Sequence, residues 1–385
     1  MDLNKIDFST IEKATLTVLY PFTYSKQKVL QQDEVSLVKF PAEYLKDFLP
    51  YTRNFFGQYH FSEDPSSVSL PCVLRNNDVS SIEFIKDKRI KEVVGIKNFQ
   101  LFFFEKSIAI LSIEYDIPEN LTDEEYLYYH HKLSMLEKRS KQNIQTSQDK
   151  EFKYYFEFID DLISPYCDKN QNIFGRSNLH TYNLLQATAA TEDKDTKSFL
   201  EPLTQYRAKL DIFSQHEINA NHIQQTANIN TIANENVVVH IGIQKDENDF
   251  IANEFFKKYQ NNHFLTYIIT LYQVSKLEQL IIKAFLREVE SHDLKNMRSI
   301  KREILHFISN GNFTKISNNS IRNNLYKFYR DSFEVENFID EIDTIAEKIT
   351  NEIETKQARA RERRELFLNV MIGLIGIGLG IAGLL

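Results

Sequence analysis

The pattern of hydrophobic and polar positions changes along the chain, and it begins as a strand pattern. The clearest apolar runs are FQLFFF at 99–104 and IAILSIEY at 108–115, which are separated by three polar residues. Two such runs with a short polar connection predict an antiparallel hairpin. A further strand is predicted at 11–21, and VVVHIGI at 237–243 returns to the same pattern. We therefore expect an α+β protein whose N-terminal domain is built on a mainly antiparallel sheet.

From Asp246 onward the pattern becomes helical. Apolar residues recur at helical spacing over 263–291, and further helices are predicted at about 293–309 and 320–332. The last helix begins near Glu334, and neither Gly nor Pro interrupts it before Asn369. The pattern predicts one helix of about fifty residues, which at about 1.5 Å per residue spans on the order of 75 Å.

These patterns divide the chain into four predicted regions. The polar stretch NIQTSQDK at 143–150 predicts a hinge after the N-terminal domain. Residues 1–145 are predicted to form an α+β cytosolic domain, and residues 146–245 a mixed connecting region that contains a strand at 237–243. Residues 246–365 are predicted to form a stalk of long antiparallel helices, and residues 366–385 a single transmembrane helix.

The transmembrane prediction rests on the segment LFLNVMIGLIGIGLGIAGLL at 366–385. It carries no charge, and Asn369 is its one polar side chain. Twenty helical residues reach about 30 Å, the thickness of the hydrocarbon layer of a bilayer. The alternative is a buried helix of a soluble core, but five glycines would each weaken such a helix by about 1 kcal/mol relative to Ala. In lipid, small residues instead allow helices to approach closely.

Basic residues before the segment predict its orientation. Under the positive-inside rule, they keep the N-terminal bulk in the cytoplasm, while the C-terminus crosses the inner membrane in a single pass. They also suit contact with lipid headgroups. The residues are Arg359, Arg361, Arg363 and Arg364.

Small residues line one face of the predicted span. Their spacings of three and four residues put them on one side of a helix, with Asn369 four residues before the first. A stripe of small residues led by a hydrogen-bonding side chain favours association of membrane helices, so we expect a homo-oligomer with this face at an interface or a pore. The alternative is that Gly accumulates in anchors without a partner. The stripe consists of Asn369, Gly373, Gly376, Gly380 and Gly383.

Composition excludes several classes of function. The 46 basic and 54 acidic residues give a formal net charge of −8, and no basic block with interleaved aromatics precedes the membrane-proximal arginines, so we expect no nucleic-acid partner. Phosphate-binding loops, nucleophile elbows and metal-ligand motifs are absent from the sequence. His130 and His131 are adjacent and diverge by about 100° on a helix, and His216 and His222 lack a recognised ligand spacing. We therefore expect no metal site, no cofactor and no catalytic residues.

The order of these parts resembles the CorA-like divalent-cation transporters. The likeness lies in the hairpin FQLFFFEKSIAILSIEY, the helix HFLTYIITLYQVSKLEQL and the long helix from Glu334 through RARERRELFLNVM. The resemblance implies a cytosolic α/β domain whose long helices lead into the first membrane helix of a pentamer around a pore. Asn369 matches a polar pore-facing position by analogy. That family has two membrane helices joined by a Gly-Met-Asn loop, and both the loop and the second helix are missing here.

Three functions remain open on the sequence alone. The first is a membrane-anchored oligomeric channel or pore-type effector, whose cytosolic domain senses an unknown ligand or protein partner. The second is a tail-anchored interaction or scaffold protein without transport activity. The third is a membrane-bound enzyme with an unrecognised site.

Overall fold

The computed structural model describes the backbone of most predicted elements, including the last helix, α11 (Val335–Ala382). The side chains of 375–385 are outside the described part. The described residues are 11–30, 36–38, 47–52, 72–75, 79–84, 93–104, 108–119, 121, 123–134, 143–167, 179–188, 221–226, 229–244, 254, 259–290 and 294–382.

The chain divides into two units. The first consists of Met1–Lys276 with Phe313–Glu336, and the second of Leu277–Asn312 with Asn337–Leu385. Two helices, α8 (Phe264–Glu290) and α11 (Val335–Ala382), contribute residues to both units.

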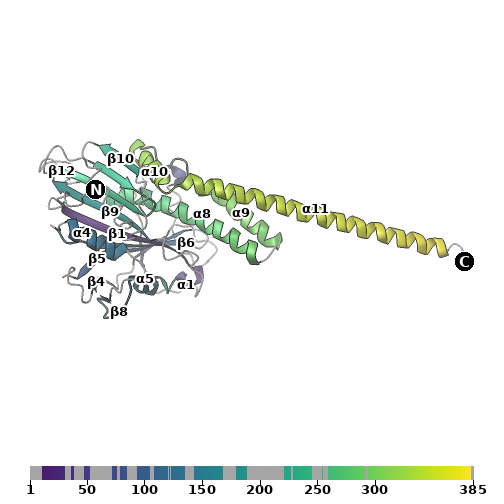
Figure 1. Cartoon of the computed structure of the whole chain (residues 1–385), viewed down its shortest axis with the longest axis horizontal. Helices are drawn as coiled ribbons and strands as arrows, with labels where there is room; N and C mark the ends of the chain where they lie inside the picture. The colour runs from purple at the N-terminus through teal and green to yellow at the C-terminus, as the bar shows by residue number, and fades with distance from the viewer. Residues whose placement is uncertain are drawn as a thin grey trace, which may run out of the picture. The chain divides into compact units, whose positions relative to one another are not determined.

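The first unit is built on one sheet, and its described strands number twelve (Figure 1). Its order is β10-β11-β12-β9-β1-β6-β5-β4-β7-β8, while β3 pairs with β5, and β2 with β3. The described pairs are antiparallel apart from β12 beside β9, so the sheet is mixed but mainly antiparallel, and the α+β class is confirmed. The strands are β1 (Ile11–Thr23), β2 (Ser36–Val38), β3 (Cys72–Arg75), β4 (Ser81–Phe84), β5 (Val94–Phe104), β6 (Ile108–Asp116), β7 (Ile144–Thr146), β8 (Glu151–Phe152), β9 (His180–Thr188), β10 (Asn221–Thr226), β11 (Ile229–Ala233) and β12 (Val237–Gln244).

The predicted hairpin lies at the centre of this sheet. Strands β5 and β6 pair with Phe104 opposite Ile108, and β6 is buried from Ile108 to Tyr115. A strand buried on both faces reads as a continuous apolar run rather than an alternating one. This explains why the signal in IAILSIEY is so strong.

Helices cover both faces of the central strands. On one face, Phe103 belongs to a hydrophobic cluster that includes residues of α4 (Asp123–Ser134) and α5 (Tyr155–Ile163). On the other face, the Phe104 ring stacks on Tyr272 of α8 with their centroids 4.5 Å apart. The short helix α1 (Lys26–Leu30), a π-helical turn (η5, Tyr259–His263) and α10 (Ser320–Ser332) complete the labelled elements of this unit.

Two predictions near the middle of the chain need correction. The stretch 143–150 is not a hinge, because β7 pairs with both β4 and β8, and the predicted boundary at residue 145 falls within β7. Its polar residues form the turn of a small hairpin, while Ile144 is buried. Strands β10 and β11, in the polar region 219–236, were not predicted. The strand expected at 237–243 is β12, and it pairs with β9 in the same sheet.

The second unit contains the end of α8, all of α9 (Leu294–Asn310) and nearly all of α11. An ion pair of 3.2 Å between Lys283 and Glu303 joins α8 to α9. Lys356 Nζ lies 3.7 Å from Met297 Sδ, which joins α11 to α9. The 48 residues of α11 confirm the predicted uninterrupted helix.

Among the described residues, no helix carries an apolar stretch long enough to cross a bilayer. The transmembrane helix predicted at 366–385 is thus not supported by them, and the side chains of 375–385 fall outside the described part.

Candidate functional site

The end of α11 continues past the helices that pack against it in the second unit. Among the residues of α11 whose side chains are described, Ile353 is the last buried one, and Lys356 reaches Met297, which lies near the start of α9. From 358 to 374 every described side chain is exposed. This stretch therefore receives no tertiary support from the described residues of its own unit.

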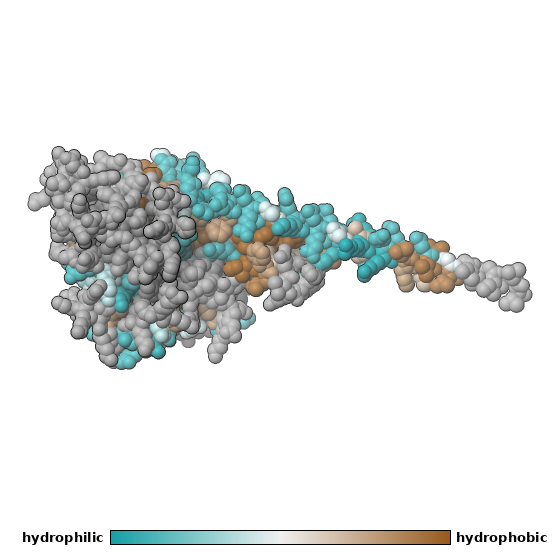
Figure 2. Space-filling model, viewed as in Figure 1, coloured by the Kyte–Doolittle hydropathy of each residue, from teal (hydrophilic) through white to brown (hydrophobic). Residues whose placement is uncertain are grey.

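Apolar side chains stand exposed around about two-thirds of the circumference of this stretch, and Asn369 and Gly373 occupy the remaining face. In Figure 2 they form the brown surface just before the grey end of the helix. Ile372 is 65% exposed and Phe367 is 66% exposed, although most large apolar side chains of this chain are buried. Contiguous exposed apolar surface marks a site of contact with protein or membrane. The residues are Leu366, Phe367, Leu368, Val370, Met371, Ile372 and Leu374, and we call them the apolar segment.

The predicted stripe starts within this segment. Asn369 is exposed, and a Cβ atom added at Gly373 would meet no atom within 4 Å. Gly376 and Gly380 lie on the same helix, but their surroundings are outside the described part, and Gly383 lies outside the described residues. The role of the stripe in association stays a prediction.

Four exposed arginines precede the apolar segment, and we call them the arginine girdle. None of them forms an ion pair or hydrogen bond within the part of the chain that the structure describes. Two glutamates are exposed beside the arginines: Glu362 lies among them in the sequence, and Glu365 follows the last of them. The girdle consists of Arg359, Arg361, Arg363 and Arg364.

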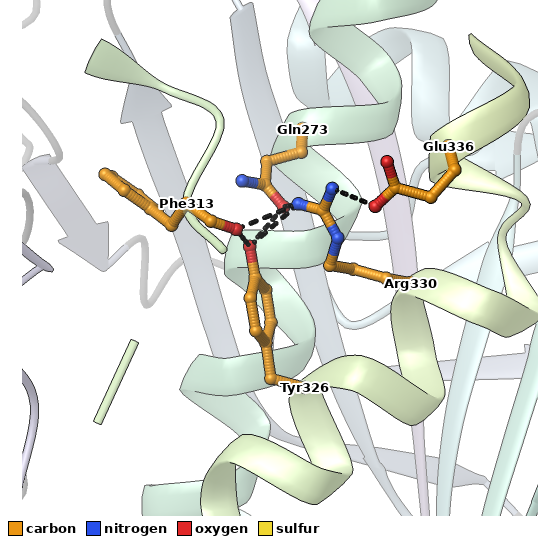
Figure 3. A network of polar contacts seen from close by, with 5 residues as sticks. All are labelled: Gln273, Phe313, Tyr326, Arg330 and Glu336. Atoms are coloured by element: carbon orange, nitrogen blue, oxygen red, sulfur yellow. Dashed lines mark hydrogen bonds and ion pairs between the residues drawn. The ribbon is translucent and has the colours of Figure 1, made fainter. Parts of the chain in front are cut away.

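At its other end, α11 is anchored by a buried polar network in the first unit (Figure 3). Arg330 of α10 is 5% exposed, and its Nη1 donates to the Phe313 carbonyl at 2.9 Å and lies 3.4 Å from Gln273 Oε1 of α8. Its Nη2 donates to Glu336 in the first turn of α11 at 2.5 Å. The Tyr326 hydroxyl lies 2.5 Å from the same Phe313 carbonyl and 2.8 Å from Gln273 Oε1. One guanidinium thus connects α8, α10 and α11.

A buried cluster of tyrosine and histidine rings lies between the sheet and these helices. The two nitrogens of His240 in β12 contact the Thr231 hydroxyl at 2.6 Å and the Tyr329 hydroxyl of α10 at 2.8 Å. Tyr182 of β9 donates its hydroxyl to the Tyr259 carbonyl at 2.9 Å. Burial lowers the pKa of His240 to about 3, so the ring is neutral and acts as a hydrogen-bonding strut. These contacts fasten α10 to the sheet.

The histidines considered in the sequence have structural surroundings. His130 Nε2 of α4 lies 3.0 Å from the Thr181 hydroxyl of β9. Burial, and then the charge of Lys132, lower the pKa of His131 to about 4. His222 lies in β10, and His216 is outside the described residues. Within the described ranges, no group of His, Cys, Asp and Glu side chains is arranged to hold a metal ion.

Sequence reasoning missed the network around Arg330. A usable signal exists in α10, because Tyr326 and Arg330 are four residues apart and lie beside the apolar positions Leu325 and Tyr329. A charged residue on a buried helix face needs a partner, and this need could have singled out Arg330. Its partners in α8 and α11 could not have been identified from spacing.

No protein-family model, curated protein or solved structure matches the chain.

Proposed function

We propose that the chain is a membrane-anchored oligomeric effector of channel or pore type, which acts through the end of α11. The observation that carries the proposal is the apolar segment, exposed around about two-thirds of the circumference of a helix that extends past its described neighbours in the second unit. A helix that is hydrophobic all round is stable when it is buried in protein or lipid. The arginine girdle lies immediately before it, as the positive-inside rule requires of a cytoplasmic flank.

The energetics of the apolar segment favour a bilayer. At about −0.3 to −0.6 kcal/mol for each Leu, Ile, Phe or Val near the membrane centre, its six residues of these types contribute at most roughly −2 to −4 kcal/mol. The sequence from Ile375 to Leu385 adds further Leu and Ile without any charge. Association through the stripe of Asn369 and glycines would then bring several spans together and produce the pore.

The polar network supports a route from the cytosolic domain to the membrane. Arg330 and Val335 fix the first turn of α11 to the first unit, where Val335 is buried and Arg330 binds Glu336. The same helix continues without a break to Ala382. A ligand or protein partner that shifted α10 would therefore change the position of the start of the helix whose end carries the apolar segment.

A leakage assay tests the proposal. Full-length chain synthesised with dye-loaded liposomes should release the dye or an ion, whereas a chain ending at Glu365 should not. Replacing the residues after Glu365 by a polyleucine helix of equal length gives a matched control that still inserts but lacks the stripe. Leakage by the truncated chain would refute the proposal.

The alternative is a tail-anchored scaffold protein without transport activity. One observation favours it: anchoring requires only the apolar segment and the girdle, both of which are exposed in the single chain. A scaffold should keep its membrane attachment and its activity with the polyleucine helix, whereas a pore that needs Gly373 should lose its conductance. Insertion without leakage in the native chain would favour the scaffold.

A further inference from the structure

We propose that the arginine girdle binds anionic phospholipid headgroups and so directs the protein to negatively charged bilayers. This inference rests on the proposed membrane attachment and adds the class of lipid that the site recognises. It concerns affinity and lipid choice, beyond the orientation that basic flanks set.

The girdle lies at the right depth for headgroups. Along the helix axis, Arg364 lies about 3 Å and Arg359 about 10 Å before Leu366, at about 1.5 Å per residue. The headgroup layer on each side of the hydrocarbon is roughly 5–7 Å thick. With Leu366 at the hydrocarbon boundary, the nearer arginines lie within the headgroup layer and the farther ones can reach it, because arginine side chains extend toward the interface.

The guanidinium groups are available for external anions. All four side chains are exposed and, within the described residues, make no ion pair or hydrogen bond. The one girdle pair with a glutamate at a spacing of four, Arg361 before Glu365, has the less favourable order of charges for a helical ion pair. Arginine presents a planar fork of donors that matches phosphate oxygens in bidentate geometry. Phosphodiesters are therefore the anions that this surface fits best.

The charges are segregated around the helix. At about 100° per residue, Glu362 and Glu365 fall within about 40° of Asn369, as Gly373 does. Arg359 and Arg361 fall about 80° to either side of Asn369, and Arg363 and Arg364 fall on the far side of the helix. In the proposed oligomer the stripe face turns toward neighbouring copies. Arg363 and Arg364 then face outward, toward the surrounding lipid, and Arg359 and Arg361 lie at the edges of the stripe face.

Charge explains why such a site is needed on this chain. The whole protein has a formal net charge of −8, so an anionic leaflet repels it as a whole. The girdle and its two glutamates provide a local charge of +4 − 2 = +2 beside the bilayer. The same net charge disfavours nucleic acid as the partner, and an apolar segment directly after the girdle suits a membrane.

A vesicle-partition experiment tests the inference. Full-length chain is synthesised in the presence of a mixture of neutral phosphatidylcholine vesicles and vesicles containing one-third phosphatidylglycerol, which are then separated by flotation. Each basic residue near an anionic surface changes partitioning by about fivefold. With a local charge of +2, we expect a preference of about 25-fold for the anionic vesicles, reduced strongly in 0.5 M salt.

Three variants make the test specific to the girdle. Replacing all four girdle arginines by Gln leaves only Glu362 and Glu365 as local charges, so it should abolish the preference for anionic vesicles. A control variant changes the net charge by the same amount at exposed sites outside the girdle, and it should keep the preference for anionic vesicles. Its substitutions are Arg298→Gln, Arg302→Gln, Lys315→Gln and Lys327→Gln. The double variant Glu362→Gln/Glu365→Gln should increase the preference.

The outcomes separate this inference from the proposed function. Equal insertion of the native chain into both vesicle types, or equal losses in the girdle and control variants, would overturn the lipid preference and leave membrane attachment standing. Failure to float with either vesicle type would overturn both proposals. A girdle-dependent retention on single-stranded RNA, without any lipid preference, would reassign the surface to nucleic acid.

Discussion

The network at the start of α11 allows a quantitative prediction for Arg330→Met. Methionine keeps most of the length of the side chain but removes the donors to the Phe313 carbonyl and Glu336. A hydrogen bond from a charged group contributes about 1.5–3 kcal/mol, and a buried acceptor left without a donor costs about 1–3 kcal/mol. After the substitution, the single Tyr326 proton must serve both the Phe313 carbonyl and Gln273 Oε1. The lost hydrogen bond and the unsatisfied acceptor are two views of the same contact, so their free energies are not added. We expect Arg330→Met to lower the free energy of unfolding by about 2–4 kcal/mol.

Two milder variants show which contact matters. Glu336 is 67% exposed, so its ion pair with Arg330 is worth about 1 kcal/mol or less, and Glu336→Gln should cost no more than that. Tyr326→Phe should cost about 1 kcal/mol, because Arg330 continues to donate to both acceptors. Tyr326 and Arg330 share partners, so the double variant should deviate from additivity by more than 0.5 kcal/mol, on the order found for contacting residues.

The measurement is urea unfolding of the chain ending at Glu365, followed by circular dichroism because the sequence has no tryptophan. The described residues removed by this truncation are exposed, so the core of the first unit is kept. Amide exchange in the first turn of α11 provides a second readout and should accelerate in Arg330→Met. An effect of Arg330→Met below 0.5 kcal/mol, or one no larger than that of Glu336→Gln, would refute the reasoning.

The remaining predictions concern packing, pH and the junction before α11. Gly311→Ala would place a Cβ 2.6 Å from the buried Phe307 ring, so we expect the free energy of unfolding, measured with denaturant, to fall by about 1–3 kcal/mol. The matched control is Gly373→Ala, whose Cβ meets no atom within 4 Å, and it should leave the stability of the detergent-solubilised monomer unchanged. The pKa of His240 is lowered to about 3 in the folded state, so as pH falls the imidazole of the unfolded chain is protonated before that of the folded chain. The free energy of unfolding should therefore fall by about 1.4 kcal/mol per pH unit below about pH 6.5. His240→Gln should flatten that part of the slope between pH 6 and 4.5, and an unchanged slope would assign it to other groups. Glu334 has a φ of 53°, so Glu334→Asn should give a more stable protein than Glu334→Val by about 1 kcal/mol or more, and equal thermal midpoints would contradict this.

The elements that could be predicted from the sequence are those with strong periodicity and local connections. The hairpin of β5 and β6 and the helices α8, α9 and α10 appear within a residue or two of their expected bounds, apart from the start of β5. In each, the apolar spacing matches a single period over several turns or strand residues. The continuity of α11 followed from the lack of any helix breaker.

The strands that were missed are short or polar, and they become strands by pairing with other strands. Strand β10 (NHIQQT) is polar and becomes a strand by pairing with β11, which in turn pairs with β12. Strand β7 is three residues long and is held by β4, about sixty residues earlier in the sequence. Tertiary pairing here overrides a weak local preference, as is common for strands. The contact of Arg330 with Gln273, 57 residues away, was hidden for the same reason.

The two halves of α11 require different surroundings, and this difference is the strongest physical argument about function. Up to Ile353 its buried residues follow one stripe, with Val335, Ile342 and Ile349 seven residues apart. A single stripe is what a helix needs to pack against other protein helices. From Leu366 the apolar side chains spread over about two-thirds of the circumference, and no described neighbour covers them. An exposed helix of this kind cannot be stabilised by one more helix on one face, so an apolar surrounding such as lipid, with further copies of the helix within it, satisfies its chemistry.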